Sequence, residues 1–264
     1  MKTLRRTAAV LLAAASLLAF PAQATSFSTD QSDLWYIVAE SGWGMQLVQR
    51  GNIIFATVFV YGPTGAPTWY VATMSSADGL TWTGDLYATT GPWFGAVPFN
   101  PANVTARKAG TMTWTRQTVE TGMLNYVVDG VAVTKNVVRQ TLVFDDFSGM
   151  YLGALHGTAT GCTNPANNTP PVDIPGFNIT VTQNGQAMTM VLSAFGTTIT
   201  ISGTFTQSGQ FGTLMGTYSA TGGEVGNAIV SAMNVQTHSL AADFSLSSTN
   251  DGCLTVGYVA GMRA

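Results

Sequence analysis

The chain has 264 residues, of which 46% are hydrophobic and only 9% charged, and its formal net charge is −3 at pH 7. A nucleic-acid-binding protein needs a basic patch or stripe, and none appears here. After Arg139 the only cation is Arg263. The composition therefore excludes nucleic acid as an expected partner.

The first 24 residues predict a cleaved secretory signal peptide. Lys2, Arg5 and Arg6 precede the apolar run Ala8–Phe20, and Ala22-Gln23-Ala24 gives a small-x-small cleavage pattern. The apolar run is shorter than the roughly 20 residues that a membrane-spanning helix needs. Without these three cations, 7 basic side chains stand against 13 acidic ones. We expect a periplasmic or secreted protein that does not insert into a membrane.

The remaining chain predicts an all-β protein. Runs rich in Val, Ile, Thr and aromatic residues alternate with Gly, Asn, Pro and Asp turns every 8 to 15 residues, which is typical of a sandwich or a barrel. Asp129-Gly130 is the favoured pair for a two-residue hairpin, because both positions need positive φ. The best candidate for a short helix, Gly223–Val235, is also compatible with a strand.

An internal repeat divides the mature chain into two halves. Residues 42–62 align with residues 176–196 without a gap at an offset of 134, so that Gln49 matches Gln183 and glycines match at the turn. We expect an N-terminal Trp-rich domain over 25–141 and a C-terminal domain over 148–264. About eight strands in each half predict two tandem up-and-down antiparallel β-barrels, because closing each sheet removes its exposed edges. A β-sandwich is the alternative fold.

Cys162 and Cys253 predict one disulfide bond in the second barrel. In an exported protein an isolated pair of cysteines is most simply a disulfide, and here it would tie the end of the first strand to the last strand. The alternative is a metal site with His156, but two thiols and two distant histidines lack compact ligand spacing. We expect no metal and no cofactor.

No pattern of catalytic residues is present. His156 and His238 are the only histidines, and the sequence contains no G-x-S-x-G, H-E-x-x-H or phosphate-loop motif. The pair Asp145-Asp146 suits an exposed turn better than acid–base catalysis. We therefore expect a protein that is not an enzyme.

Six tryptophans lie within the first 114 residues and suggest either a packed barrel core or a ligand-binding interior. An eight-stranded barrel is just wide enough either to be filled by side chains or to hold one small ligand. Trp93, beside Phe94 in a Gly/Pro-rich loop, suits a lid or rim. The candidate ligand-binding residues are Trp35, Glu40, Ser41, Trp43, Tyr61, Trp69, Trp82, Trp93, Trp114 and Arg116.

Glu40 and Ser41 are expected at the mouth of the first barrel. If Trp43 points inward, the alternation of strand side chains sends Met45 and Leu47 inward as well. A carboxylate beside a serine and indoles suits the polar head of a ligand. The alternative is a turn in which Glu40 pairs with Arg50, Arg107 or Arg116, or accepts hydrogen bonds from backbone N–H groups.

The segment Leu34–Met45, LWYIVAESGWGM, resembles the W-x4-E-S-G-W-G signature of a family of secreted bacterial proteins, most of them uncharacterised. The resemblance covers about residues 33–141 and implies export and a β-rich module, without naming a ligand. The architecture also resembles calycin and avidin-type barrels, which bind small molecules inside. The start Asp33-Leu34-Trp35-Tyr36 lacks the usual glycine two residues before the tryptophan, so biotin binding is not implied. Further matches of the first family lie at Gly51, Ile54-Phe55-Ala56, Phe59, Tyr61, Pro67, Trp69, Val128–Val131, Lys135 and Arg139-Gln140.

Three function classes follow from these features. The leading hypothesis is an exported non-catalytic binding protein whose N-terminal aromatic barrel holds a small apolar, amphipathic or sugar ligand. The second is a structural or adhesive surface or assembly module with a protein partner, which the low charge and the Gly, Thr and Ser content suit. The third is an outer-membrane β-barrel.

Overall fold

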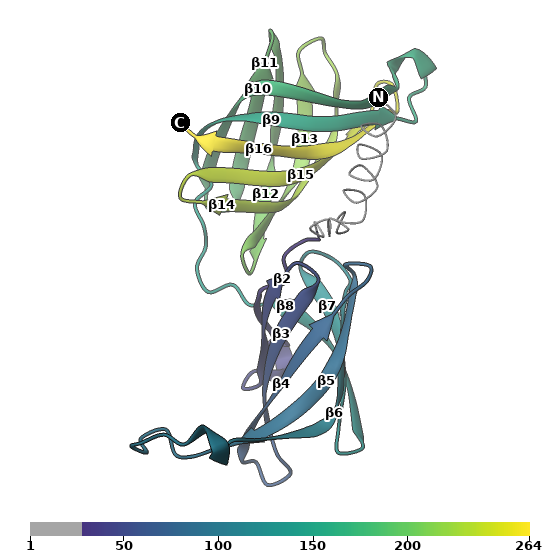
Figure 1. Cartoon of the computed structure of the whole chain (residues 1–264). Coiled ribbons are helices and arrows are strands. Elements are labelled where there is room, and N and C mark those ends of the chain that lie inside the picture. The colour runs from purple at the N-terminus through teal and green to yellow at the C-terminus, as the bar shows by residue number, and fades with distance from the viewer. Residues whose placement is uncertain (1–27) are drawn as a thin grey trace, which may run out of the picture.

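The computed structural model describes residues 28–264, so the predicted signal peptide lies outside the described residues. Two closed antiparallel barrels of eight strands each follow one another along the chain (Figure 1). The predicted fold class is confirmed, and closure of both sheets excludes the β-sandwich alternative. Within residues 28–264, no helix is long and apolar enough to cross a membrane.

The first barrel contains strands β1 to β8 and two short 3-10 helices. Each strand pairs with the next, and β8 closes the barrel by pairing with β1. Its elements are β1 (Asp33–Tyr36), η1 (Val38–Glu40), β2 (Gly44–Arg50), β3 (Ile53–Tyr61), β4 (Pro67–Ser75), β5 (Thr81–Thr90), η2 (Pro101–Asn103), β6 (Thr105–Arg116), β7 (Thr121–Val128) and β8 (Val131–Arg139).

The second barrel repeats this scheme with strands β9 to β16, and β16 pairs with β9. The candidate helix at 223–235 is a strand, β14. Its elements are β9 (Gly149–Thr160), η3 (Pro165–Asn167), β10 (Thr169–Asn184), β11 (Ala187–Ala194), β12 (Thr197–Ser208), β13 (Phe211–Ala220), β14 (Val225–Gln236), β15 (Ser239–Ser248) and β16 (Leu254–Arg263).

Both barrels bury an apolar core because strand side chains alternate between the inside and the outside. In the first barrel Met45 and Leu47 point inward as expected and are buried, while Trp43 packs against the edge of the core. The Asp129-Gly130 hairpin also forms as predicted, with φ of 47° and 84°. The largest buried side chains are Trp35, Trp82 and Trp114 in the first barrel and Phe147 and Tyr151 in the second.

The aligned hairpins occupy equivalent positions, as the second and third strands of the two barrels. The backbone N–H of Gln49 donates to Ser32 Oγ at 2.8 Å, and that of Gln183 donates to Ser148 Oγ at 3.1 Å. In each case the glutamine side-chain carbonyl accepts from the backbone N–H of the residue before that serine, at 2.8 and 3.0 Å. These matched hydrogen bonds support the internal repeat.

The two barrels also close in the same way. The last residue of β8, Arg139, lies opposite Trp35 of β1, with its guanidinium 4.4 Å from the indole ring. The last residue of β16, Arg263, lies opposite Tyr151 of β9, with its guanidinium 5.5 Å from the phenol ring. An arginine from the last strand thus covers an aromatic ring of the first strand in both barrels.

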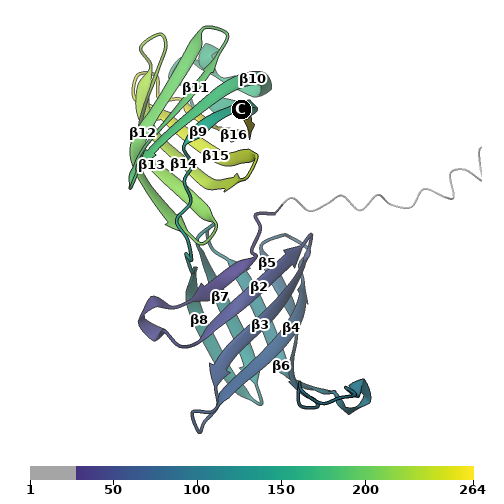
Figure 2. The same ribbon diagram turned by 90° about the vertical axis from the view of Figure 1, so that its left-hand side faces the viewer.

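The turn between β12 and β13 contacts the first barrel, which lies at this end of the second barrel (Figure 2). The backbone N–H of Gln210 donates to Asp33 Oδ2 at 3.1 Å, and its side-chain amide donates to the Ser32 carbonyl at 2.6 Å. Nearby, Thr213 Oγ1 donates to Glu120 Oε1 at 2.8 Å. The barrels therefore contact each other through specific polar groups as well as through the linker.

Candidate functional site

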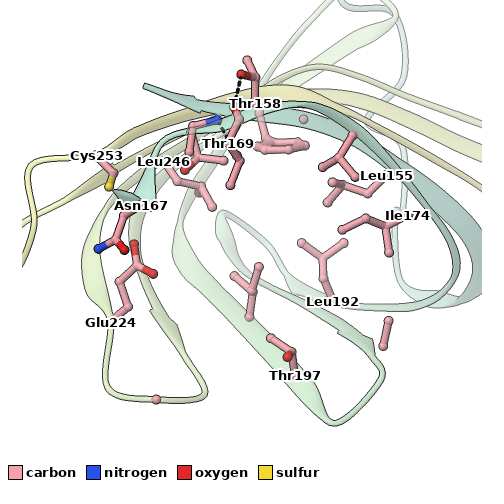
Figure 3. A pocket seen from close by; sticks show the side chains of 18 of the residues that line it. Leu155, Thr158, Asn167, Thr169, Ile174, Leu192, Thr197, Glu224, Leu246 and Cys253 are labelled. Carbon is pink, nitrogen blue, oxygen red and sulfur yellow. Dashed lines mark hydrogen bonds between the residues drawn. The ribbon is translucent and has the colours of Figure 1, made fainter. Parts of the chain in front are cut away.

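A cavity of about 720 Å³ opens at one end of the second barrel (Figure 3). It lies inside the barrel, near the end of β9 and the start of β10. The turns β11–β12, β13–β14 and β15–β16 surround its opening. This volume falls within the usual range for small-molecule sites. The apolar wall is formed by Leu155, Val172, Ile174, Phe177, Leu192, Ile199, Ile201, Phe244 and Leu246.

The residues at inward positions explain why the cavity forms at this end. Near the first barrel, aromatic side chains such as Phe147 and Phe205, whose rings lie 5.2 Å apart, fill the interior. At the opposite end the lining includes Gly157, Ala159 and Ala194, which have little or no side chain. Space therefore remains between the aliphatic residues of neighbouring strands.

A disulfide bond fixes the rim of the cavity. Cys162, just after β9, is joined to Cys253, just before β16, over a sequence separation of 91, and this predicted bond is confirmed. Asp251 accepts hydrogen bonds from the side chain of Asn167 and the backbone N–H of Asn164, and these bonds lower its pKa. Both sulfur atoms also lie near Asp251, but the disulfide occupies them, so this group is not a metal site.

Acidic and amide side chains of the rim lie on one side of the opening. Glu224 and Asn167 lie there, whereas Leu155, Ile174 and Leu192 lie across from them (Figure 3). Glu224 Oε1 accepts a hydrogen bond of 2.7 Å from the buried phenol of Tyr218. Burial, reinforced by this hydrogen bond, raises the pKa of Tyr218 to about 12. The cavity thus combines an apolar body with an acidic, hydrogen-bonding rim.

The buried tryptophans of the predicted ligand site form a packed core. Trp35 and Trp114 lie edge to face with ring centroids 4.5 Å apart, and with Trp82 they are fully buried. The indole N–H of Trp114 donates to Gln31 Oε1 at 3.3 Å, whereas that of Trp82 has no partner among the described residues. These side chains fill the interior, and the larger cavity lies in the other barrel because aliphatic and small residues line its open end.

The ESGWG segment forms a shallow recess on the first barrel. Trp35, Ser41 and Trp43 line this recess of about 270 Å³. Glu40 accepts from the indole N–H of Trp43 at 2.9 Å and pairs with Lys135 at 2.7 Å, and these contacts, Lys135 first, lower its pKa. The expected arginine partners of Glu40 were wrong, because a lysine on β8 is the neighbour. Ligand binding in this recess stays a prediction.

Four other candidate residues lie outside the two cavities described above. Tyr61 and Trp69 are exposed on the outer surface of β3 and β4, and Arg116 donates to Thr29 Oγ1 at 2.8 Å. Trp93 is exposed and packs against Phe94, with ring centroids 5.4 Å apart, in a loop that projects from the first barrel (Figures 1 and 2). The predicted lid position for Trp93 is therefore not observed, because the loop extends away from the barrel.

Sequence reasoning missed the residues that line the cavity of the second barrel. The strands over 187–206 carry many apolar residues and almost no charge, a pattern that does not distinguish a filled core from a cavity wall. The one available signal is the small residues at inward positions, such as Gly157 and Ala194, set among leucines and isoleucines. That signal becomes readable only when the facing strands are known.

The comparisons with known proteins add little to this picture. No family model matches the chain, and no curated protein matches it. A solved structure of a Bacteroides fragilis protein, provisionally described as an outer membrane protein, matches with 12% identity and a TM-score of 0.33, covering 90% of this chain and 98% of the other. A likeness at this level says nothing about function. The resemblance to the ESGWG family stays a prediction.

Proposed function

We propose that the protein is an exported, non-catalytic binding protein whose second barrel holds a small apolar or amphipathic molecule. The observation that carries this proposal is the 720 Å³ apolar cavity at the disulfide end of that barrel. A concave apolar site with a few polar groups is the usual form of a small-molecule site. The ligand site thus moves from the first barrel, where sequence reasoning placed it, to the second.

The disulfide supports a place outside the cytoplasm. Such bonds persist in oxidising compartments and are rare where thiols are kept reduced, and both cysteines of the chain are joined in one bond. Together with the N-terminal segment, this favours the periplasm or the extracellular space as the site of action.

The apolar interiors of the two barrels favour a binding protein over the outer-membrane alternative. A transmembrane barrel carries an apolar band outside and a polar interior. Here both interiors are apolar, with buried methionine, leucine and tryptophan in the first barrel and methionine, isoleucine and phenylalanine in the second. The outer face is mixed: β12 carries Thr200 and Ser202 there, whereas β9 and β16 expose apolar side chains such as Leu152 and Val256. The apolar interiors are therefore the feature that separates the two functions.

The non-catalytic part of the proposal rests on what surrounds the cavity. His156 lies outside the lining: its Nδ1 is 2.6 Å from Asp173 Oδ1, and its ring stacks on Tyr258. The acidic rim residue Asp251 is held by the amide groups of a neighbouring loop. Neither arrangement directs a nucleophile or a base toward a molecule in the cavity. Glu224, the other acidic residue of the lining, has the phenol of Tyr218 as its side-chain partner rather than a histidine or a thiol.

Titration with Nile red, an uncharged apolar dye, tests the proposal. We expect saturable binding at one site, and Leu192→Trp should weaken it about tenfold or more, because the larger side chain fills the cavity. Ser193→Trp places the same ring on the opposite face of β11 and should bind like the wild type. Absence of saturable binding, or equal affinity of the Leu192→Trp variant, would contradict the proposal.

A second candidate function, self-assembly, is favoured by the loop between β5 and β6. Its apolar side chains include Phe94 at 91% and Val97 at 95% exposure, and no charged residue occurs between Asp85 and Arg107. Exposed apolar surface of this kind marks interaction sites. Light scattering after size exclusion should find an oligomer that Phe94→Ser with Val97→Ser dissociates; a monomeric wild type would rule this function out.

A further inference from the structure

The charges around the cavity of the second barrel carry information about its ligand. Among its lining residues the only charged side chains are Glu224 and Asp251, both acidic, and there is no lysine, arginine or histidine. The inference below rests on the proposed function, since it concerns the kind of molecule that this cavity selects.

The two acidic groups have different tasks. Asp251 holds the rim loop, because it accepts hydrogen bonds from Asn164 and Asn167 and its backbone carbonyl accepts from the N–H of Thr163 at 2.7 Å. Glu224 has only the phenol of Tyr218 as a side-chain partner, on Oε1, and forms no ion pair within residues 28–264. Its second carboxylate oxygen is therefore free to accept a hydrogen bond from a ligand.

Tyr218 and the β13–β14 turn hold Glu224 at the opening. The backbone N–H of Ala220 donates to the Glu224 carbonyl at 2.8 Å, which closes the turn. Tyr218 is buried inside the barrel and reaches the carboxylate from below. Glu224 thus lies where the head of an amphiphile would lie when its tail fills the apolar cavity, next to Asn167 (Figure 3).

We propose that the cavity selects amphiphiles whose head donates hydrogen bonds, an alcohol or an ammonium group on an aliphatic body, with Glu224 as the acceptor. An anionic head would meet two carboxylates and no cation, and like charges brought together in this way are penalised. A hydroxyl or ammonium group instead gains a charge-assisted hydrogen bond. Tyr218 is a positioning residue, because it acts through Glu224.

Three ligands with the same tail test this selectivity by calorimetry: decylamine, 1-decanol and decanoate, each below the concentration at which it forms micelles. We expect decylamine to bind best and decanoate at least about tenfold more weakly, since a hydrogen bond to a charged group is worth roughly 1.5–3 kcal/mol. The preference for the amine should shrink in high salt, because salt screens exposed charges.

The variant Glu224→Gln should lower the affinity for decylamine about fivefold. The difference in affinity between decylamine and decanoate should therefore become smaller, while the affinity for Nile red stays unchanged. Asp173→Asn is the matched control, because it removes one negative charge from an exposed position of the same barrel that is outside the cavity lining. Decanoate binding as well as decylamine, or an unchanged preference in Glu224→Gln, would overturn the inference alone. Failure of Nile red and of all three ligands to bind would overturn the proposed function and the inference with it.

Discussion

Arg139 and Arg263 occupy equivalent positions but differ in how far they are buried. The side chain of Arg139 is 0% exposed, lies between the rings of Trp35 and Phe211, and pairs with Asp33 at 3.1 Å. It also donates to three backbone carbonyls. Arg263 is exposed and donates to the phenol oxygen of Tyr151 at 3.0 Å. Arg139 therefore completes a buried network, whereas Arg263 lies on the surface above Tyr151.

Replacing these arginines should have unequal effects. Arg139→Ala removes the buried guanidinium and leaves the mostly buried Asp33 without its charged partner. Breaking a buried ion pair costs about 3–5 kcal/mol of the free energy of unfolding. Arg263→Ala should cost only about 1 kcal/mol, as expected for an exposed cation near an aromatic ring. Urea unfolding of both variants measures the difference. Equal losses would show that the buried network adds no stability beyond that of an exposed cation.

The contacts of Glu40 show what sequence reasoning can and cannot reach at the scale of one residue. Its place in a turn before Trp43 could be predicted from the E-S-G-W-G segment, and a cation was one of the partners considered for it. Its partner, Lys135, is 95 residues away on β8, and only the closure of the barrel brings the two together. Local patterns predict the conformation of a segment, but they do not specify its neighbours across the sheet.

Two turns with the same backbone conformation differ in what surrounds them. Gly185, between β10 and β11, has φ of 60°, and a side chain there would meet nothing within 4 Å. Gly209, between β12 and β13, has φ of 59°, but a Cβ atom would collide with the carboxylate of Asp33 and lie 2.8 Å from Arg139 Cβ. Only the second turn is packed against the other barrel.

Alanine at these two positions separates turn strain from contact between barrels. Gly185→Ala should lose about 1 kcal/mol of unfolding free energy, because a non-glycine residue is strained at positive φ. Gly209→Ala should lose more and should also weaken the hydrogen bonds of Gln210 to the first barrel. Chemical denaturation of both variants gives the comparison. If they lose the same amount, the contact at the β12–β13 turn contributes no stability.

The turn between β4 and β5 is held by Asp78, which is exposed. Its carboxylate accepts from the backbone N–H groups of Thr81 and Leu80, both at 2.8 Å, and from Ser76 Oγ at 2.9 Å. These bonds lower its pKa to about 2 from the usual 3.8. Since the folded state favours the ionised form, this group stabilises the fold above about pH 3.8, and its contribution is lost as the pH falls toward 2.

Substitution of Asp78 should therefore flatten the acid limb of the stability profile. Asp78→Asn keeps an acceptor but removes the titration, so the urea midpoint should fall less between pH 4 and pH 2 than in the wild type. Ser76→Ala removes one of the three donors and should give an intermediate slope. A profile identical to the wild type in Asp78→Asn would contradict this account.

At the scale of the whole molecule, only the second barrel carries a disulfide, while all six tryptophans lie in the first barrel. Tryptophan emission therefore reports on the first barrel, and far-ultraviolet circular dichroism reports on both. The bond closes a long loop, and chain-entropy arguments assign about 4.6 kcal/mol to a loop of this length. Its removal should act on one barrel more than on the other.

Cys162→Ser with Cys253→Ser should lower the unfolding midpoint followed by circular dichroism and leave the midpoint followed by tryptophan emission nearly unchanged. Nile red binding should weaken as well, because the bond fixes the rim of the cavity. If both midpoints fall together, the two barrels unfold as one unit, and the contacts of Gln210 and Arg139 couple them.

The all-β class, the two-barrel architecture, the Asp129-Gly130 hairpin and the bond between Cys162 and Cys253 could all be predicted from the chain, because each depends on local alternation, turn chemistry or residue type. Which barrel has space inside could not be predicted in this way. That outcome depends on the summed volumes of side chains from eight strands at facing positions, which no single segment contains. The tryptophans that suggested a ligand site fill the first barrel. In the second barrel, small residues such as Gly157 and Ala194 leave space at one end.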